Sequence, residues 1–138
     1  PDTLSITTFG SFSGSHKWGG AALLPNGLVL ASPLDATQLL LINQYTQQTT
    51  LFGNISGTHK WLTLIVLPNG YVLMPPSCHA SALLVNPYTQ ETMTIGNFGT
   101  TSGAKWDGAS LTPQGIIVCA PCVYSGALLI DISRIPFL

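Results

Sequence analysis

The chain carries the stretch Ser15-His16-Lys17-Trp18, followed seven residues later by Pro25-Asn26-Gly27. Related stretches follow at Thr58-His59-Lys60-Trp61 with Pro68-Asn69-Gly70, and at Gly103-Ala104-Lys105-Trp106 with Pro113-Gln114-Gly115. The steps are 43 residues (Trp18 to Trp61) and 45 residues (Trp61 to Trp106). A period of about 40–50 residues is typical of four-stranded propeller blades. The repeat therefore predicts an all-β fold made of about three similar units.

Turn signals divide each unit into short strands. Asn-Gly between apolar runs is a strong hairpin signal, because both residues tolerate positive φ. Apolar runs such as Leu39-Leu40-Leu41-Ile42 are typical of strands buried on both faces, and frequent Pro and Gly argue against long helices. We expect antiparallel strands at 19–24, 28–32, 38–43, 49–52, 62–67, 71–74, 81–86, 92–95, 108–112, 116–120 and 127–132.

The 138 residues form a single domain whose units are incomplete at both ends. The segment after the third unit is short and contains Pro136, so no fourth strand is expected there. At the other end, residues 4–10 resemble 49–53 and 93–99, and we expect them to be the outer strand of a blade whose inner strands lie elsewhere. The expected divisions are an outer strand at 3–10 and repeats at 16–53, 59–99 and 104–138.

Three blades are too few to close a ring within one chain, since known propellers have about four or more. An open arc exposes edges and faces that favour association. Two copies could close a six-bladed ring, copies could join head to tail into a filament, or the chain is a piece of a longer array. Of these three outcomes, we favour the closed ring of two copies. Its assembly strand would contain Leu4, Ile6, Thr8 and Phe9, and its partners would be other copies of this chain.

Charged side chains make up only 7% of the chain, against roughly 25% in an ordinary domain, while 46% of the residues are hydrophobic. A net charge of −1 offers no attraction for nucleic acid or an anionic membrane, and no apolar run approaches the length of a membrane span. Surfaces of Ser, Thr, Asn and Gln also repel one another little. Self-association is therefore favoured over binding to nucleic acid or insertion into a membrane.

The pattern Asn54-Ile55-Ser56 is an acceptor for N-glycosylation, and it falls in a loop between two repeats. It makes Asn54 a candidate modification site. We expect an extracellular or cell-surface location for the chain.

The repeats resemble those of β-propellers of the kelch, NHL and quinoprotein-like kinds. The elements that carry this resemblance are Lys17-Trp18, Pro25-Asn26-Gly27, Lys60-Trp61, Pro68-Asn69-Gly70 and Asn86-Pro87-Tyr88-Thr89. The resemblance covers almost the whole chain and implies blades of four antiparallel strands. It implies little about activity, because propellers include enzymes, lectins and scaffolds.

Each repeat has a lysine at the entry to its first strand, at Lys17, Lys60 and Lys105. In a propeller this strand lines the central channel, where the three cations could face an anionic ligand. The alternative is that each lysine donates hydrogen bonds to backbone carbonyls, or pairs with a nearby acid, and fixes the loop.

A tryptophan follows each lysine directly, at Trp18, Trp61 and Trp106. Exposed indoles with neutral polar neighbours can stack on sugar rings, and one site per blade would give a multivalent, lectin-like module. Alternatively, each indole is a wedge between blades, with its N–H on a loop carbonyl. We expect a structural, self-assembling module, with the lectin-like module and its glycan partners as the alternative.

Catalytic and metal-binding patterns are weak throughout the chain. The spacing of Cys119 and Cys122 allows a disulfide, a redox or metal site, or free thiols. His16 and His59 recur without the neighbouring carboxylate or thiol that a metal site needs. No Ser-His-Asp set, carboxylate pair or phosphate-binding loop can be argued. We expect no enzymatic activity, no cofactor and no metal.

Overall fold

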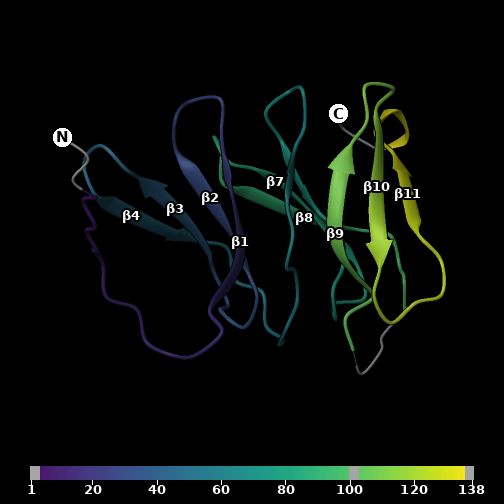
Figure 1. Ribbon diagram of the computed structural model, residues 1–138, viewed down its shortest axis with the longest axis horizontal. Helices are drawn as coiled ribbons and strands as arrows, with labels where there is room; N and C mark the ends of the chain where they lie inside the picture. The colour runs from purple at the N-terminus through teal and green to yellow at the C-terminus, as the bar shows by residue number, and fades with distance from the viewer. Residues whose placement is uncertain (1–3, 100–102, 136–138) are drawn as a thin grey trace.

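The computed structural model describes residues 4–99 and 103–135, which form three antiparallel β-sheets arranged side by side (Figure 1). The first sheet contains β1 (Trp18–Leu23), β2 (Val29–Pro33), β3 (Leu39–Asn43) and β4 (Gln48–Phe52). The second contains β5 (Ile65–Val66), β6 (Val72–Met74), β7 (Ala82–Asn86) and β8 (Glu91–Ile95). The third contains β9 (Trp106–Leu111), β10 (Ile116–Pro121) and β11 (Leu128–Asp131). A short 3-10 helix, η1 (Ile132–Arg134), follows, and the described ranges contain no α-helix.

The all-β prediction is confirmed. For the strands expected between residues 19 and 132, each boundary lies within two residues of the observed one, except the start of β5. Residues 62–67 were expected there, but only Ile65–Val66 pair with β6. The reason lies in the first sheet, where the Ser32 hydroxyl donates to the Leu62 carbonyl at 3.3 Å. Residues 62–64 therefore lie against the first sheet instead of joining the second.

The turns between the first two strands of each sheet follow from their sequence. Gly27, Gly70 and Gly115 have φ angles of +88°, +89° and +82°, which side chains other than glycine rarely adopt. The side-chain oxygen of Asn26 accepts the Leu28 backbone N–H at 3.0 Å, which stabilises the turn locally. These glycines give all three sheets the same hairpin geometry.

The turn between the third and fourth strands explains why the third sheet is shorter. In the first two sheets Asn43 and Asn86 each accept two backbone N–H groups of the turn, and the chain then returns as β4 or β8. The third sheet has Asp131 at this place, which accepts the Ser133 backbone N–H and begins η1. No fourth strand therefore forms on β11 within the described residues.

Two hydrophobic cores lie between the sheets. The first joins the first and second sheets and includes Leu30, Trp61 and Val85, and the second joins the second and third sheets and includes Leu84 and Trp106. The second sheet is therefore covered on both faces, as its continuous apolar strands predicted. Among residues 4–99 and 103–135, the first and third sheets have one neighbouring sheet each.

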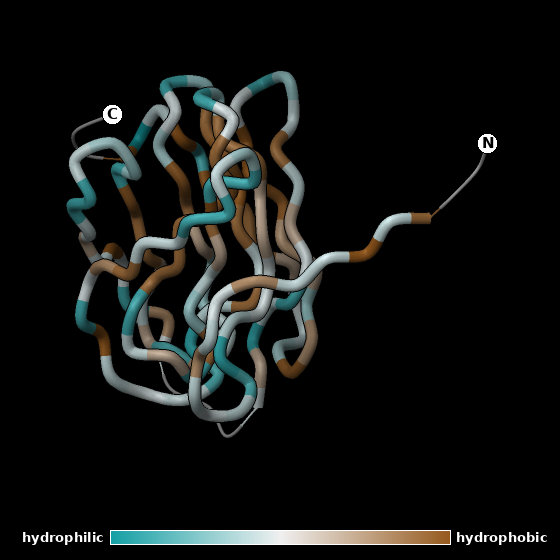
Figure 2. The backbone as a smooth tube through the Cα atoms, turned by 90° about the vertical axis from the view of Figure 1, so that its left-hand side faces the viewer, coloured by the Kyte–Doolittle hydropathy of each residue, from teal (hydrophilic) through white to brown (hydrophobic). Residues whose placement is uncertain are grey.

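The N-terminal segment leads away from the sheets (Figure 2). Residue 3 of the expected strand lies outside the described residues, and residues 4–17 form no strand with any described part of the chain. Leu4 and Ile6 are 82% and 80% exposed. Two large aliphatic side chains are thus left in solvent at the end of the row of sheets opposite to the three-stranded sheet.

Replacing Trp61 by Ala should lower the free energy of unfolding by about 3–5 kcal/mol, because the fully buried indole fills the first core. Denaturant titration measures this loss. Trp18→Ala is the matched control and should cost less, since Trp18 is only half-buried. Equal losses for the two variants would contradict the proposed role of Trp61 as a buried wedge.

Candidate functional site

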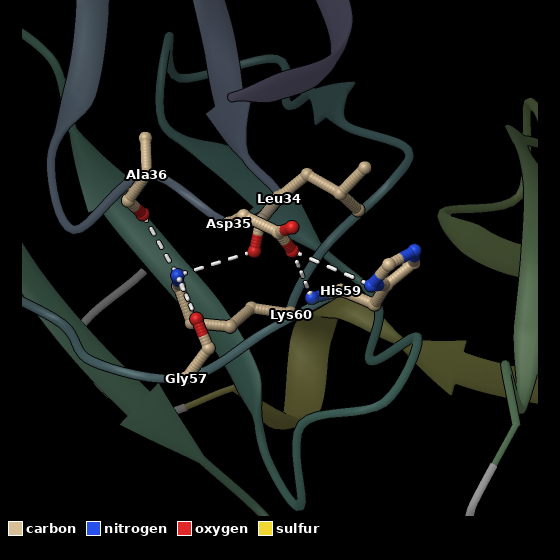
Figure 3. Close-up of polar contacts among 6 residues, drawn as sticks. All are labelled: Leu34, Asp35, Ala36, Gly57, His59 and Lys60. Carbon is tan, nitrogen blue, oxygen red and sulfur yellow. Dashed lines mark hydrogen bonds and ion pairs between the residues drawn. The ribbon is translucent and has the colours of Figure 1, made fainter. Parts of the chain in front are cut away.

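The lysine of the second repeat joins two neighbouring sheets (Figure 3). The Lys60 ammonium donates to the carbonyls of Leu34 at 3.2 Å, Ala36 at 2.7 Å and Gly57 at 3.0 Å. Leu34 and Ala36 follow β2 of the first sheet, whereas Lys60 leads into the second. Since an ammonium has three donors, all of the hydrogen-bonding capacity of Lys60 is used by backbone oxygens.

The third repeat repeats this arrangement. The Lys105 ammonium donates to the carbonyls of Ser77 at 3.2 Å and His79 at 2.7 Å, which follow β6 of the second sheet. Lys60 and Lys105 are both buried, and this burial lowers the pKa of each. Nearby Asp35 partly opposes the lowering at Lys60, and Cys78 does so at Lys105. We call these two contacts the lysine clasps.

Lys17 stands at the same place in the first repeat but has no preceding sheet to join. Its ammonium donates to the Gly14 carbonyl at 2.7 Å, which corresponds to the contact of Lys60 with Gly57. No described residue occupies the places that Leu34 and Ala36 take at Lys60. Lys17 therefore has the position of a clasp lysine, but within the described part of the chain it lacks the carbonyls that the loop of a preceding sheet would provide.

Asp35 and the repeated histidines strengthen the first junction. The Asp35 carboxylate accepts the His59 backbone N–H at 2.7 Å and lies 3.4 Å from His59 Nδ1 (Figure 3). The His16 and His59 rings are 5.8 Å apart. His79 instead stacks on Trp61 at 4.5 Å, and burial lowers the pKa of His79. Across the described residues, no three His, Cys, Asp or Glu side chains gather into a group that could hold a metal ion.

The three tryptophans occupy equivalent structural positions. Each indole N–H donates to a backbone carbonyl twenty residues later: Trp18 to Gln38 at 3.0 Å, Trp61 to Ser81 at 2.9 Å, and Trp106 to Gly126 at 3.0 Å. Trp61 and Trp106 are buried, so neither presents a ring face on which a sugar could stack. Trp18 is half-buried and borders a cavity of about 400 Å³ lined also by Ser13 and Thr37.

The base of the N-terminal segment is shaped like the end of an outer strand. Gly10 has a φ of +80°, close to +81° at Gly53 and +73° at Gly96 after β4 and β8. Phe12 lies edge-on to Trp18 at 5.1 Å, just as Phe98 lies edge-on to Trp106 at 5.8 Å. These equivalences align Gly10 with Gly96, not with Gly99 as the pairing of 4–10 with 93–99 had implied.

A second candidate surface lies at the free edge of β11. An apolar cavity of about 370 Å³ opens there, between the third sheet and the end of β8. Leu128, Ile130 and Ile135 line it from the third sheet and the residues after it, and Ile95 and Phe98 line it from the second. We call this cavity the edge groove. Sequence reasoning missed it, because it depends on the strand that the third sheet lacks.

The three cysteines are free thiols in the structure. Cys119 lies buried on β10, and its burial raises the pKa of the thiol to about 11. Cys122 is exposed just beyond β10, and its pKa is raised by a hydrogen bond with Asp107. The disulfide that the spacing of Cys119 and Cys122 allowed is thus not formed. Asn54 is exposed in the loop after β4.

Lys60→Met should lower the free energy of unfolding by about 2–3 kcal/mol, because three carbonyls at the junction lose a charged donor. Denaturant titration checks this loss. Gln44→Met places the same side chain on an exposed turn, and we expect a change below about 0.5 kcal/mol. A loss for Lys60→Met no larger than that of the control would show that the clasp does not stabilise the junction.

The buried Cys119 thiol should make stability depend on pH. Because its folded pKa is raised from 9.0 to about 11, its contribution is fully present below pH 9 and is lost as the pH rises to about 11. The free energy of unfolding of Cys119→Ala should therefore fall less over this range than that of the native chain. Parallel titrations at several alkaline pH values measure the difference, and identical pH profiles would contradict it.

Comparison with known proteins places the fold but gives no family. No protein-family model matches the chain, and no curated protein matches it. Within the described ranges, the chain has no helix with the length and apolar character needed to cross a lipid bilayer.

Several solved structures share the fold at low sequence identity. Two show the extracellular domain of one B. thetaiotaomicron protein, described once as a proposed one component system and once as a proposed hybrid two component system. They are 17% and 15% identical, with TM-scores of 0.64 and 0.66 over 83% and 90% of this chain. Kuenenia stuttgartiensis hydrazine synthase is 16% identical, with a TM-score of 0.62 over 91% of this chain. The chain spans only 15%, 17% and 37% of the lengths of these three structures.

Proposed function

We propose that this chain is a structural, self-assembling module of propeller-type blades, in which the N-terminal segment of one copy completes the third sheet of another. One observation carries the proposal: an exposed apolar segment and an open apolar groove occur on the same chain, at opposite ends of the row of sheets. The segment has the local shape of an outer strand, and the groove lies where an outer strand is missing.

The exposed faces support the same conclusion. Leu129 on the outer face of the third sheet is 65% exposed, whereas Leu84, its equivalent in the second sheet, is 3% exposed beneath the third. Exposed apolar strands beside an open edge favour pairing with another chain. The low charge of the chain offers little repulsion against it.

The proposed assembly is a closed ring of two copies, with six blades in total. In such a ring both ends of the row of sheets in each copy contact the other copy, and two is the smallest number of chains that can achieve this. A head-to-tail filament uses the same contact without closing, and it leaves one open edge at each end. Both forms depend on the same complementary edges, so they differ only in the curvature of the row of blades.

An extracellular or cell-surface location forms part of the proposal. It is supported by the extracellular domains among the similar structures and by the exposed Asn54 in its glycosylation pattern.

A lectin-like role is the second candidate, and one observation favours it. The cavity beside Trp18 combines a half-buried indole with Ser13, Thr37 and Lys17, which are groups that can bind sugar hydroxyls. Adding glycans should then change tryptophan fluorescence in the native chain but not in Trp18→Phe. The same change in both chains would exclude this cavity as the binding site.

The native chain should have a mass in solution of at least twice 14.6 kDa, measured by light scattering after size-exclusion chromatography. Deleting residues 1–10 removes the segment and should give monomers or disordered aggregates. Tyr45→Ser removes an exposed aromatic side chain from the turn between β3 and β4, outside the segment and the edge groove, and serves as the control with unchanged mass. A native chain that remains monomeric up to its solubility limit would overturn the proposal.

A further inference from the structure

The chain contains two junctions between successive sheets, and they are built alike. The first joins the first sheet to the second, and the other joins the second to the third. We infer that the contact between copies is a third junction of this kind, in which residues 5–9 pair with β11 of a second copy and Lys17 clasps the carbonyls of its Cys122 and Tyr124. This inference rests on the proposed self-assembly and specifies its register.

The pairing of outer strands fixes the register. In the second sheet Ala82 lies opposite Ile95 and Asn86 lies opposite Glu91. In the first sheet Leu39 and Phe52 hold the places of Ala82 and Ile95. In both sheets the paired residues lie at the same number of residues from the turn glycine (Gly27 or Gly70) and from the glycine after the outer strand (Gly53 or Gly96).

The same offsets locate the partners across the copies. Ile117 pairs with Ile130 in the third sheet as Val72 pairs with Val85 in the second. Counted from these pairs and from the turn glycine Gly115, Ala127 corresponds to Ala82, and Asp131 corresponds to Asn86. Gly10 corresponds to Gly96, which ends the outer strand of the second sheet. Counted back from these glycines, Phe9 corresponds to Ile95, and Ser5 corresponds to Glu91. Phe9 therefore lies opposite Ala127, and Ser5 lies opposite Asp131.

This register directs one exposed side chain into the edge groove. In this register Ile6 corresponds to Thr92 of the second sheet. The Thr92 methyl group lies beside Gly53 of the first sheet, 3.9 Å from the position that a Cβ atom on Gly53 would take. The equivalent of Gly53 is Gly96, which borders the edge groove. Ile6 would thus leave solvent and fill an apolar cavity that no described side chain fills.

The lysine clasps give the second set of contacts. Besides their ammonium contacts, Lys60 and Lys105 donate their backbone N–H groups to Leu34 and Ser77, both at 3.0 Å. Leu34 and Ser77 also donate to the carbonyls of Lys17 and Lys60 at 3.0 Å. One hydrogen-bonded row thus passes from sheet to sheet.

The row ends at the third sheet with unused groups. The Cys122 N–H donates to the Lys105 carbonyl at 2.9 Å, so Cys122 takes the place of Leu34 and Ser77. Its own carbonyl has no backbone partner among the described residues, and neither has the Lys17 N–H. Tyr124 correspondingly takes the place of Ala36 and His79. A second copy would let the row continue across the contact.

The base of the segment adds one further hydrogen bond. The backbone N–H groups of Ile55 and Phe98 donate to the carbonyls of Thr37 and Ala80, both at 2.7 Å. By the same equivalence the Phe12 N–H would donate to Ser125 of the second copy. The pairing of residues 5–9 with β11, the hydrogen bond of Phe12 and the contacts of Lys17 are therefore all compatible with a single placement of the second copy.

Crosslinking tests the register directly. Chains carrying Thr7→Cys or Thr8→Cys are mixed with chains carrying Leu129→Cys or Leu128→Cys, all in a background with Cys78→Ser and Cys122→Ser. Thr7 with Leu129 and Thr8 with Leu128 are the directly opposite pairs, and one of the two is the closer, non-hydrogen-bonded type that suits a disulfide. We expect an oxidised dimer on a non-reducing gel from at least one of these mixtures.

The shifted mixture, Thr8→Cys with Leu129→Cys, is the control and should not crosslink, because a one-residue shift places the side chains on opposite faces. Crosslinking only in the shifted mixture would overturn the register while leaving self-assembly intact. Chains that associate without any of these crosslinks would overturn the inferred contact as a whole. Chains that do not associate at all would overturn the proposed function itself.

The native Cys122 provides a second readout. Its equivalents Leu34 and Ser77 are 8% and 3% exposed beneath the next sheet, whereas Cys122 is exposed. In a Cys78→Ser chain, maleimide labelling of Cys122 should therefore slow as the chain concentration rises and copies associate. Labelling that is independent of concentration, in a chain shown to associate, would contradict burial of this loop.

Lys17→Met tests the clasp between copies. Removing a charged donor from the contact should weaken association about tenfold or more and restore rapid labelling of Cys122. The stability of the dilute monomer should remain unchanged, because the Lys17 ammonium contacts only Gly14 among the described residues. Lys60→Met, in contrast, should lower the stability of the monomer as well, because Lys60 clasps carbonyls of its own chain. Unchanged association of Lys17→Met would overturn the role of Lys17.

Discussion

The inner strands of the sheets carry apolar side chains on both faces, and this constraint governs the rest of the structure. A sheet with two apolar faces is stable in water only when another layer covers each face. The second sheet meets this condition within the chain, since its strands are buried on both sides. The first and third sheets do not, because each has an outer face that no other sheet of the described residues covers.

Two of the four cationic side chains of the chain lie at the places where sheets meet. Lys60 and Lys105 lie buried at the two junctions, and each ammonium is compensated by backbone carbonyls instead of by an acidic side chain. An ammonium deprived of water is costly unless its donors are satisfied, so the loops that surround it must hold a fixed geometry. The buried lysines thereby set how one sheet stands relative to the next, while the hydrophobic cores provide most of the stabilisation.

Much of the fold could be predicted from the repeat, because the turns are local. Pro-Asn-Gly requires a glycine with positive φ at Gly27 and Gly70, and apolar runs on either side must then pair. The shortness of β5 could not be predicted, since it results from a contact between Ser32 and Leu62 that are thirty residues apart. The edge groove was also unpredictable, because a cavity is a property of three-dimensional packing.

The candidate site was predicted in its residues but not in its geometry. Sequence spacing singled out the recurring Lys-Trp pairs and offered both a ligand-binding and a structural interpretation. The distinction depends on whether each side chain faces solvent, and burial of Trp61 and Lys60 arises from a neighbouring sheet. The equivalence of Gly10 with Gly96 likewise became visible only through their backbone angles and the rings of Phe12 and Phe98.

The contact of Phe12 with Trp18 has a consequence for how quickly copies could join. It anchors the root of the N-terminal segment on its own chain, so that only the five residues before Gly10 need to become ordered during an encounter. Ordering one residue costs about 1–2 kcal/mol of conformational entropy, and a segment anchored at its root loses less of this freedom than a wholly loose tail. In the proposed assembly, the aromatic pair would therefore lower the entropic barrier to docking without touching the surface on which the segment docks.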